Sequence, residues 1–147
     1  MSTFRKFEDI EAWQKARDIT HSIYSISSQG PFSRDYALRD QIRRASISIV
    51  SNIAEGFERG GTKEFVQFLS VAKGSVGELR TQLYIALDQG YIDRKVFDEI
   101  SNLALETGRL IAGLMKYLRQ TAIKGNKYRT LETRNSKPET RKSELEP

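Results

Sequence analysis

The chain has 147 residues, a formal net charge of +5 and no cysteine. This length suits one domain with its own core, and the lack of cysteine excludes a disulfide framework and a thiolate metal site. The first residues lack the apolar segment of a signal peptide, and no run approaches the roughly 18 apolar residues of a membrane span. We therefore expect a cytoplasmic protein without a membrane partner.

The basic excess lies mainly at the C-terminal end. Residues 1–120 contain 17 Lys and Arg against 15 Asp and Glu, whereas residues 121–147 contain 7 against 4. The first segment is close to neutral, so its overall charge does not mark it as a nucleic-acid binder. A local basic patch is still compatible with this balance.

Apolar residues recur at intervals of three and four in four successive segments, which predicts four amphipathic helices. The first helix is expected over about residues 8–27 and ends before Gly30 and Pro31. Glycine readily adopts the left-handed backbone conformation that terminates a helix, and proline cannot continue a helix. The second follows Ser33 as its N-cap and ends near Arg59. Its predicted core face consists of Leu38, Ile42, Ala45, Ile49, Ile53 and Gly56.

The pair Gly60-Gly61 forms a short turn, so the second and third helices must form an antiparallel hairpin. The third helix is expected to have Thr62 as its N-cap and to end near Asp88. The fourth is expected from its cap Asp93 to about Gln120. No segment shows the alternation of a β-strand. The pattern predicts an all-α, antiparallel up-down-up-down four-helix bundle.

Residues 121–147 differ from the rest in composition. They are polar, and ETRNSKP (Glu132–Pro138) is nearly repeated as ETRKSEL (Glu139–Leu145). Polar, low-complexity sequence cannot bury enough apolar surface to fold. We therefore expect a bundle domain at residues 1–120 and a disordered basic tail at 121–147, which is either only solvated or touches a polyanion weakly.

The second helix carries another apolar row, Ile47, Val50 and Ala54, well over a quarter turn from its core face. A lone bundle has little use for this row, which favours an oligomer. Gly74 and Gly108 lie inside helices, where each costs about 0.5–1 kcal/mol relative to alanine. They indicate close approach of helices or subunits. The alternative is sequence drift at surface positions that tolerate glycine. The predicted subunit contact comprises Ile47, Val50, Ala54, Gly74, Gly108 and Ala112.

The sequence contains no recognisable catalytic arrangement. The only histidine, His21, lies away from the core face, so the inward Glu-x-x-His pairs of ferritin-like dimetal proteins are absent. No glycine-rich phosphate loop follows a strand, and no recognisable pattern places a base beside a serine. We expect a protein that is not an enzyme and has no metal or cofactor.

Polar residues near the seam of the second and third helices have two interpretations. Asn52 sits at the edge of the core face, where an unpaired amide would cost about 1–3 kcal/mol. The seam is either a small pocket at a subunit contact or a hydrogen-bond and ion-pair network that fixes helix register, and we favour the network. Its predicted members are Asn52, Glu55, Ser75 and Glu78.

The densest basic set lies on the same hairpin. Arginine binds phosphate bidentately, which suits nucleic-acid binding. Acidic residues interleave with the set, so an ion-paired, solvated face is the alternative, and Arg43 and Arg44 are expected to pair with Glu55 or Glu78. The candidate nucleic-acid-binding residues are Arg39, Arg43, Arg44, Arg59, Lys63, Lys73 and Arg80.

Three stretches carry a family resemblance: FEDIEAWQKARDI (Phe7–Ile19), LRDQIRRASISIVSNIAEGFERG (Leu38–Gly60) and EFVQFLSVAKGSVGELRTQLYIALDQGYI (Glu64–Ile92). They resemble the bacterial four-helix-bundle family named for open reading frames within intervening sequences of large-subunit ribosomal RNA. The likeness covers residues 4 to about 120. It implies a homopentamer packed as a ring around a central channel. That family usually has proline at the position of Val50, which implies a straighter helix here.

A more distant similarity, to the accessory variability proteins of diversity-generating retroelements, implies a basic barrel that binds nucleic acid and, by analogy, a reverse transcriptase. Two hypotheses result. The chain is either an oligomeric ring whose basic surface binds RNA or DNA, or a structural or protein-interaction scaffold with no nucleic-acid ligand. The salt dependence of RNA binding separates them.

Overall fold

A computed structural model describes residues 4–135 of the chain, with the side chains of residues 4–123. This part contains four α-helices, two short 3-10 helices and no strand. The predicted all-α class with four long helices is therefore confirmed. The elements are η1 (Phe7–Asp9), α1 (Glu11–Ser27), η2 (Gly30–Arg34), α2 (Tyr36–Glu58), α3 (Thr62–Asp88) and α4 (Arg94–Asn135).

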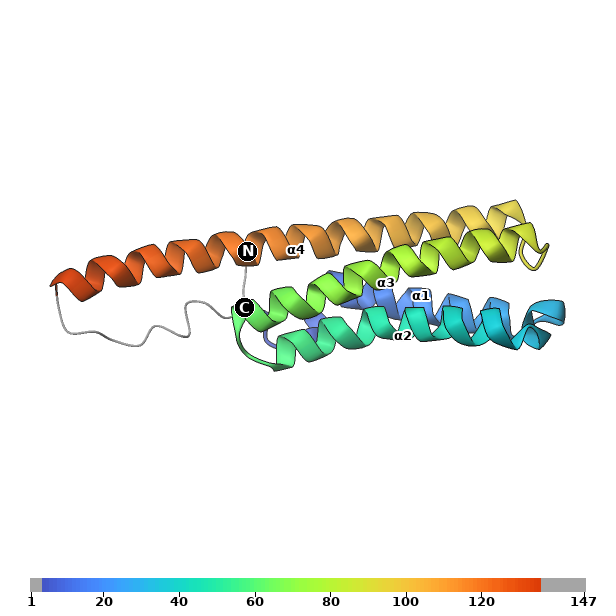
Figure 1. The fold of residues 1–147 in the computed structure, drawn as a ribbon, viewed down its shortest axis with the longest axis horizontal. Helices are drawn as coiled ribbons and strands as arrows, with labels where there is room; N and C mark the ends of the chain where they lie inside the picture. Colours follow the sequence, from blue (N-terminus) through green and yellow to red (C-terminus); the bar gives the residue numbers. More distant parts are fainter. Residues whose placement is uncertain (1–3, 136–147) are drawn as a thin grey trace.

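The four helices form an antiparallel bundle in which neighbours in sequence are neighbours in space (Figure 1). Helix α1 packs against α2 and α4, and α3 packs against the same two helices from the other side. Helix α2 continues through Val50 without interruption, as expected without the proline. Each helix contributes one apolar row to the core, as the sequence period predicts.

The core face predicted for α2, from Leu38 to Gly56, is buried at every position. Full burial of one aliphatic side chain contributes about 1.5–3 kcal/mol relative to leaving it exposed. The largest side chains with almost no exposure come from all parts of the bundle. They are Ile10, Ile19, Ile23, Phe32, Ile42, Ile49, Ile53, Phe65, Leu69, Leu79, Leu83 and Ile111.

Two predicted helix caps differ from the observed ones. The N-cap of α2 is Asp35 rather than Ser33, because Ser33 lies inside η2, and the Asp35 Oδ1 accepts the Leu38 N–H at 3.1 Å. Thr62 is the first residue of α3, and Gly61 is its N-cap. Asp93 caps α4 as predicted, since its Oδ1 accepts the Val96 N–H at 2.9 Å.

Helix α4 does not end near Gln120 but continues to Asn135, so that it runs well past the α2–α3 turn (Figure 1). It covers residues 121–135 of the segment expected to be disordered, whereas 136–147 lie outside the described residues. The polar composition indicated a lack of core-forming side chains. It did not exclude a helix, since the segment contains no proline before Pro138 and many residues of good helix propensity.

Helices α2 and α3 approach each other closely at Gly56, near their connecting turn. A Cβ atom at Gly56 would lie 2.7 Å from the Cβ of Phe68 and 3.0 Å from the Cδ1 of Phe65. Phe65 is only 1% exposed, and its ring meets that of Phe57 edge-on at 6.0 Å. The missing side chain at Gly56 therefore sets the separation of the two helices here.

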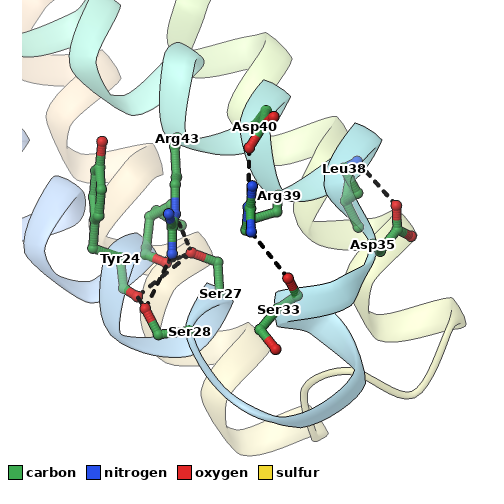
Figure 2. A network of polar contacts seen from close by, with 10 residues as sticks. Tyr24, Ser27, Ser28, Ser33, Asp35, Leu38, Arg39, Asp40 and Arg43 are labelled. Carbon is green, nitrogen blue, oxygen red and sulfur yellow. Dashed lines mark hydrogen bonds and ion pairs between the residues drawn. The ribbon is translucent and has the colours of Figure 1, made fainter.

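Arg43 of α2 holds the C-terminal end of α1 (Figure 2). Its Nε donates a hydrogen bond to the Ser27 Oγ at 2.8 Å, and its Nη2 donates to the Ser28 Oγ at 3.0 Å. The guanidinium also covers the ring of Tyr24, 4.6 Å from the ring centroid. A cation at the C-terminal end of a helix interacts favourably with the helix dipole. Arg43 is thus a structural clamp between α1 and α2.

Asp35 joins the start of α2 to the α3–α4 connection. Its Oδ2 accepts a hydrogen bond from the Tyr91 hydroxyl at 2.9 Å, and the Tyr91 ring stacks on Phe32 at 5.1 Å. This hydrogen bond, more than burial or the negative charge of Asp35, raises the pKa of the Tyr91 hydroxyl. The same carboxylate therefore caps a helix and anchors a loop.

Replacing Gly56 with alanine is expected to lower the free energy of unfolding by about 1–3 kcal/mol, because a Cβ at this position forces α2 and α3 apart. Urea denaturation followed by circular dichroism measures the change. Gly113→Ala is the matched control, since a Cβ there has nothing within 4 Å, and helix propensity then favours the alanine by about 0.5–1 kcal/mol. Equal stability of the two variants would contradict the close approach at Gly56.

Arg43→Ala is expected to lower stability by about 1.5–3 kcal/mol, because it removes hydrogen bonds from a charged donor to Ser27 and Ser28. Arg43→Lys should recover only part of the loss, since lysine lacks the planar fork. Arg44→Ala is the control, because Arg44 is exposed and surface changes usually stay within about 0.5 kcal/mol. Melting temperatures compare the three, and similar values for Arg43→Ala and Arg44→Ala would rule out the clamp.

Candidate functional site

A cleft of about 340 Å³ between α3 and α4 combines cationic side chains with small residues. Lys73 and Arg80 enter it from α3, and Arg109 enters it from α4. Lys73 and Arg80 lie seven residues apart, so two helical turns place them on the same side of α3. The rest of the lining is apolar or glycine: Val76, Gly77, Ala104, Leu105, Gly108 and Ala112.

Small residues keep this cleft open. A Cβ at Gly77 would have nothing within 4 Å, and one at Gly108 would make an ordinary contact of 3.5 Å with the Val76 Cγ1. The glycines are therefore not needed for close helix packing within the chain. Their effect is to leave room between Lys73, Arg80 and Arg109.

The cations of the cleft lack anionic partners within the described part of the chain. The ion pairs found there are Lys15–Glu106, Arg39–Asp40, Arg59–Glu55 and Arg94–Asp98. The Arg80 Nε is buried and has no hydrogen-bond partner among these residues. A buried donor without a partner costs about 1–3 kcal/mol, and more when it is charged. Because the Arg80 side chain also lines the cleft, an anion bound there would offset part of this cost through charge-assisted contacts with the guanidinium.

The seven predicted nucleic-acid-binding cations divide into three groups. Arg39, Arg43 and Arg59 are engaged within the chain: Arg39 with Asp40 at 2.9 Å, Arg43 with the α1 serines, and Arg59 with Glu55 at 2.8 Å. Arg44 and Lys63 are exposed and lie outside the cleft. The structure brings together only two members of the set, Lys73 and Arg80.

Arg109 completes the cleft and was missed by the sequence interpretation. The sequence did contain an indication of its role. Gly108 and Ala112 were assigned to the predicted subunit contact, and Arg109 lies between them on α4. It was missed because it is far in sequence from the α2–α3 hairpin, where basic residues are densest.

The predicted pairing of Arg43 with Glu55 or Glu78 is wrong, because Arg43 lies on the side of α2 that faces α1. Glu55 pairs instead with Arg59, which follows it by one helical turn. No pair of Arg44 with either acid is found in the described chain. The choice of partner depends on which neighbouring helix each side chain faces.

The predicted polar network forms in part. The Asn52 Nδ2 donates to the Ser48 carbonyl at 2.8 Å and to the Ser48 Oγ at 3.1 Å, and the Ser48 and Ser75 hydroxyls lie 2.8 Å apart. Asn52 and Ser75 are thus linked through Ser48 across the α2–α3 seam. Glu55 pairs with Arg59 instead, and Glu78 is exposed beside a different cleft between α2 and α3.

The residues of the predicted subunit contact lie on separate surfaces. Ile47 is 41% exposed, while Val50 and Ala54 are half-buried and Val50 packs against the core. Gly74 is exposed on α3, and a Cβ there would have nothing within 4 Å. Gly108 and Ala112 instead line the cationic cleft.

Other kinds of site are not found in the described residues. No three His, Cys, Asp or Glu side chains there come close enough together to hold a metal ion. His21 is exposed, as predicted. None of the helices searched is both long and apolar enough to cross a membrane.

Comparison with known proteins identifies the family. Residues 8–113 match the family described as 23S rRNA-intervening sequence protein. A crystal structure of a protein of unknown function from the S23 ribosomal protein family of Bacteroides thetaiotaomicron VPI-5482 has a TM-score of 0.66 and 22% identity to this chain, and the match covers 71% of this chain and 95% of that one. This identity supports the fold alone.

No curated protein matches the chain significantly. The more distant similarity to retroelement accessory proteins stays a prediction. The family match over residues 8–113 spans well over half of the sequence and includes α1, α2, α3 and the cleft residues of α4. The chain therefore belongs to the 23S rRNA-intervening sequence protein family.

Proposed function

We propose that the protein is a non-enzymatic helical bundle that binds RNA or DNA through phosphate contacts in the α3–α4 cleft. One observation carries this proposal: Lys73, Arg80 and Arg109 surround one cleft that no described carboxylate lines. Arginine and lysine form charge-assisted hydrogen bonds with phosphate oxygens, which are stronger than those between neutral groups.

The charge balance favours a local binding site over attraction of the nucleic acid by the overall charge of the protein. Residues 1–120 are nearly neutral, so affinity must come from cations that the fold leaves without partners. Contacts to phosphate position a nucleic acid without reading its bases, so binding should tolerate changes of base sequence. It should also weaken with salt, because each neutralised phosphate releases counterions.

We also propose that subunits assemble into a ring, with five copies by family resemblance. Support comes from the apolar row on α2, where Ile47 is 41% exposed beside Val50 and Ala54. Exposed Gly74 would join this contact. In this arrangement Gly108 and Ala112 form the floor of the cleft, and the ring repeats the cleft in every subunit, which multiplies a modest local charge.

Neutralising two cations of the cleft is expected to weaken RNA binding. For Lys73→Gln/Arg80→Gln we expect an affinity at least about tenfold lower at low salt, and a salt dependence less steep by about 1.5 in log K against log salt. Fluorescence anisotropy with a structured RNA across salt concentrations measures both quantities.

The matched control is Lys63→Gln/Arg44→Gln, which removes one lysine and one arginine outside the cleft. It should change binding much less. Equal loss in both double variants would indicate a diffuse basic surface and remove the cleft from consideration. If the wild-type protein shows no saturable binding to RNA or DNA, the scaffold without a nucleic-acid ligand is the better interpretation.

Ile47→Asp is expected to disrupt the assembly, because it places a charge in an apolar contact. Ile47 is preferable to Val50 for this test, since Val50 also packs against the core of its own bundle. Sedimentation velocity should show a smaller species while circular dichroism stays helical. Ile123→Asp on α4, where Ile123 is 59% exposed, is the control; an intact assembly in Ile47→Asp would show that the α2 row is no interface.

A further inference from the structure

We infer that the α3–α4 cleft binds the terminal phosphate of a nucleic-acid strand rather than the phosphodiesters along its backbone. This inference rests on the proposed function, because it names which phosphate of the same ligand the cleft takes. The relevant chemistry is that of a phosphomonoester, which carries about −1.5 to −2 at neutral pH. A backbone phosphodiester carries a single negative charge.

Three cations from two helices line one cleft. Lys73, Arg80 and Arg109 come from two helices and line a single cleft of about 340 Å³. A track for a nucleic-acid backbone needs free cations spaced along a groove. Arg39, Arg59 and Arg94 are each paired with a nearby carboxylate and Arg43 is bonded to serine hydroxyls, while the exposed Arg44 and Lys63 lie outside the cleft. Three cations around one cavity suit one strongly charged group.

The clefts on either side of the cationic one carry acidic residues. The cleft between α2 and α3 is lined by Asp35 and Glu78, and the cleft between α1 and α4 by Asp9 and Glu11. Arg109 lines both the α1–α4 cleft and the cationic cleft. A backbone that crossed α4 past Arg109 would thus meet two carboxylates, which repel its phosphates. A strand end needs only to enter the cationic cleft and avoids this repulsion.

The cleft can also discriminate between ligands. The Arg80 Nε is buried without a partner among the described residues, although the residue as a whole is half-buried. A site with an unsatisfied buried donor strongly disfavours ligands that lack the matching acceptor. Gly77 and Gly108 leave space for a phosphate in the cleft that the Arg80 side chain lines. A strand that ends in a hydroxyl offers only a neutral acceptor at its end, which forms a weaker hydrogen bond with a guanidinium than a phosphate oxygen does.

The test compares single-stranded RNA oligonucleotides of one sequence that carry a 5′-phosphate, a 3′-phosphate or hydroxyls at both ends. Fluorescence anisotropy with an internal label measures their affinity for the full-length protein. We expect both phosphorylated strands to bind about tenfold more tightly than the hydroxyl strand, since a dianion forms stronger charge-assisted hydrogen bonds. Lys73→Gln/Arg80→Gln should abolish the preference, and Lys63→Gln/Arg44→Gln should keep it.

Each outcome bears on one proposal or the other. Equal affinity for all three strands, with salt-sensitive binding, overturns end recognition and leaves the proposed function intact. Inorganic phosphate or a nucleoside monophosphate that competes as effectively as the phosphorylated strand would show that the cleft takes a small anion, which also overturns end recognition. The absence of saturable binding to any strand overturns both proposals. Circular dichroism confirms that the variants remain folded.

Discussion

The close contact of α2 with α3 at Gly56 is the constraint on which the arrangement of the bundle depends. Because glycine has no Cβ, Phe65 and Phe68 can pack directly against the backbone of α2 beside the short turn. This contact helps to position α3, and α3 carries one side of the α2 seam and of the cationic cleft. Its inner row completes the core, Ser75 meets Ser48 across the α2 seam, and Lys73 and Arg80 face α4. The hairpin thus positions the cleft.

The cations of the cleft differ from several others of the described chain in having no partner within it. Arg43 hydrogen-bonds two serines and Arg59 pairs with Glu55, so both serve stability. The Arg80 Nε, by contrast, is buried and unsatisfied. Buried polar groups without a partner are uncommon in folded proteins, and a bound ion is one explanation for such a group. This contrast, and not total charge, is why a nearly neutral bundle can be proposed to bind a polyanion.

The proposed ring relates two weak features of one subunit. A single row of partly exposed apolar residues on α2 is small for a stable contact, and three cations in one cleft are few for a nucleic-acid site. Cyclic symmetry repeats both features in each subunit. Their small individual contributions to assembly and to nucleic-acid binding therefore add up around the ring. Helix α4 extends beyond the α2–α3 turn as far as Asn135 (Figure 1).

The sequence alone determined the four helices, most of their approximate ends and the core face of α2, because periodicity and capping act over neighbouring residues; the end of α4 at Asn135 was the exception. It also placed Asp93 at the start of α4 and glycines at the turns. Only the tertiary structure decided which cations are free. Lys73 and Arg80 meet Arg109 of another helix, while Arg43 turns to α1. Such pairings depend on which helix faces each side chain, and neither residue type nor spacing along one helix contains that information.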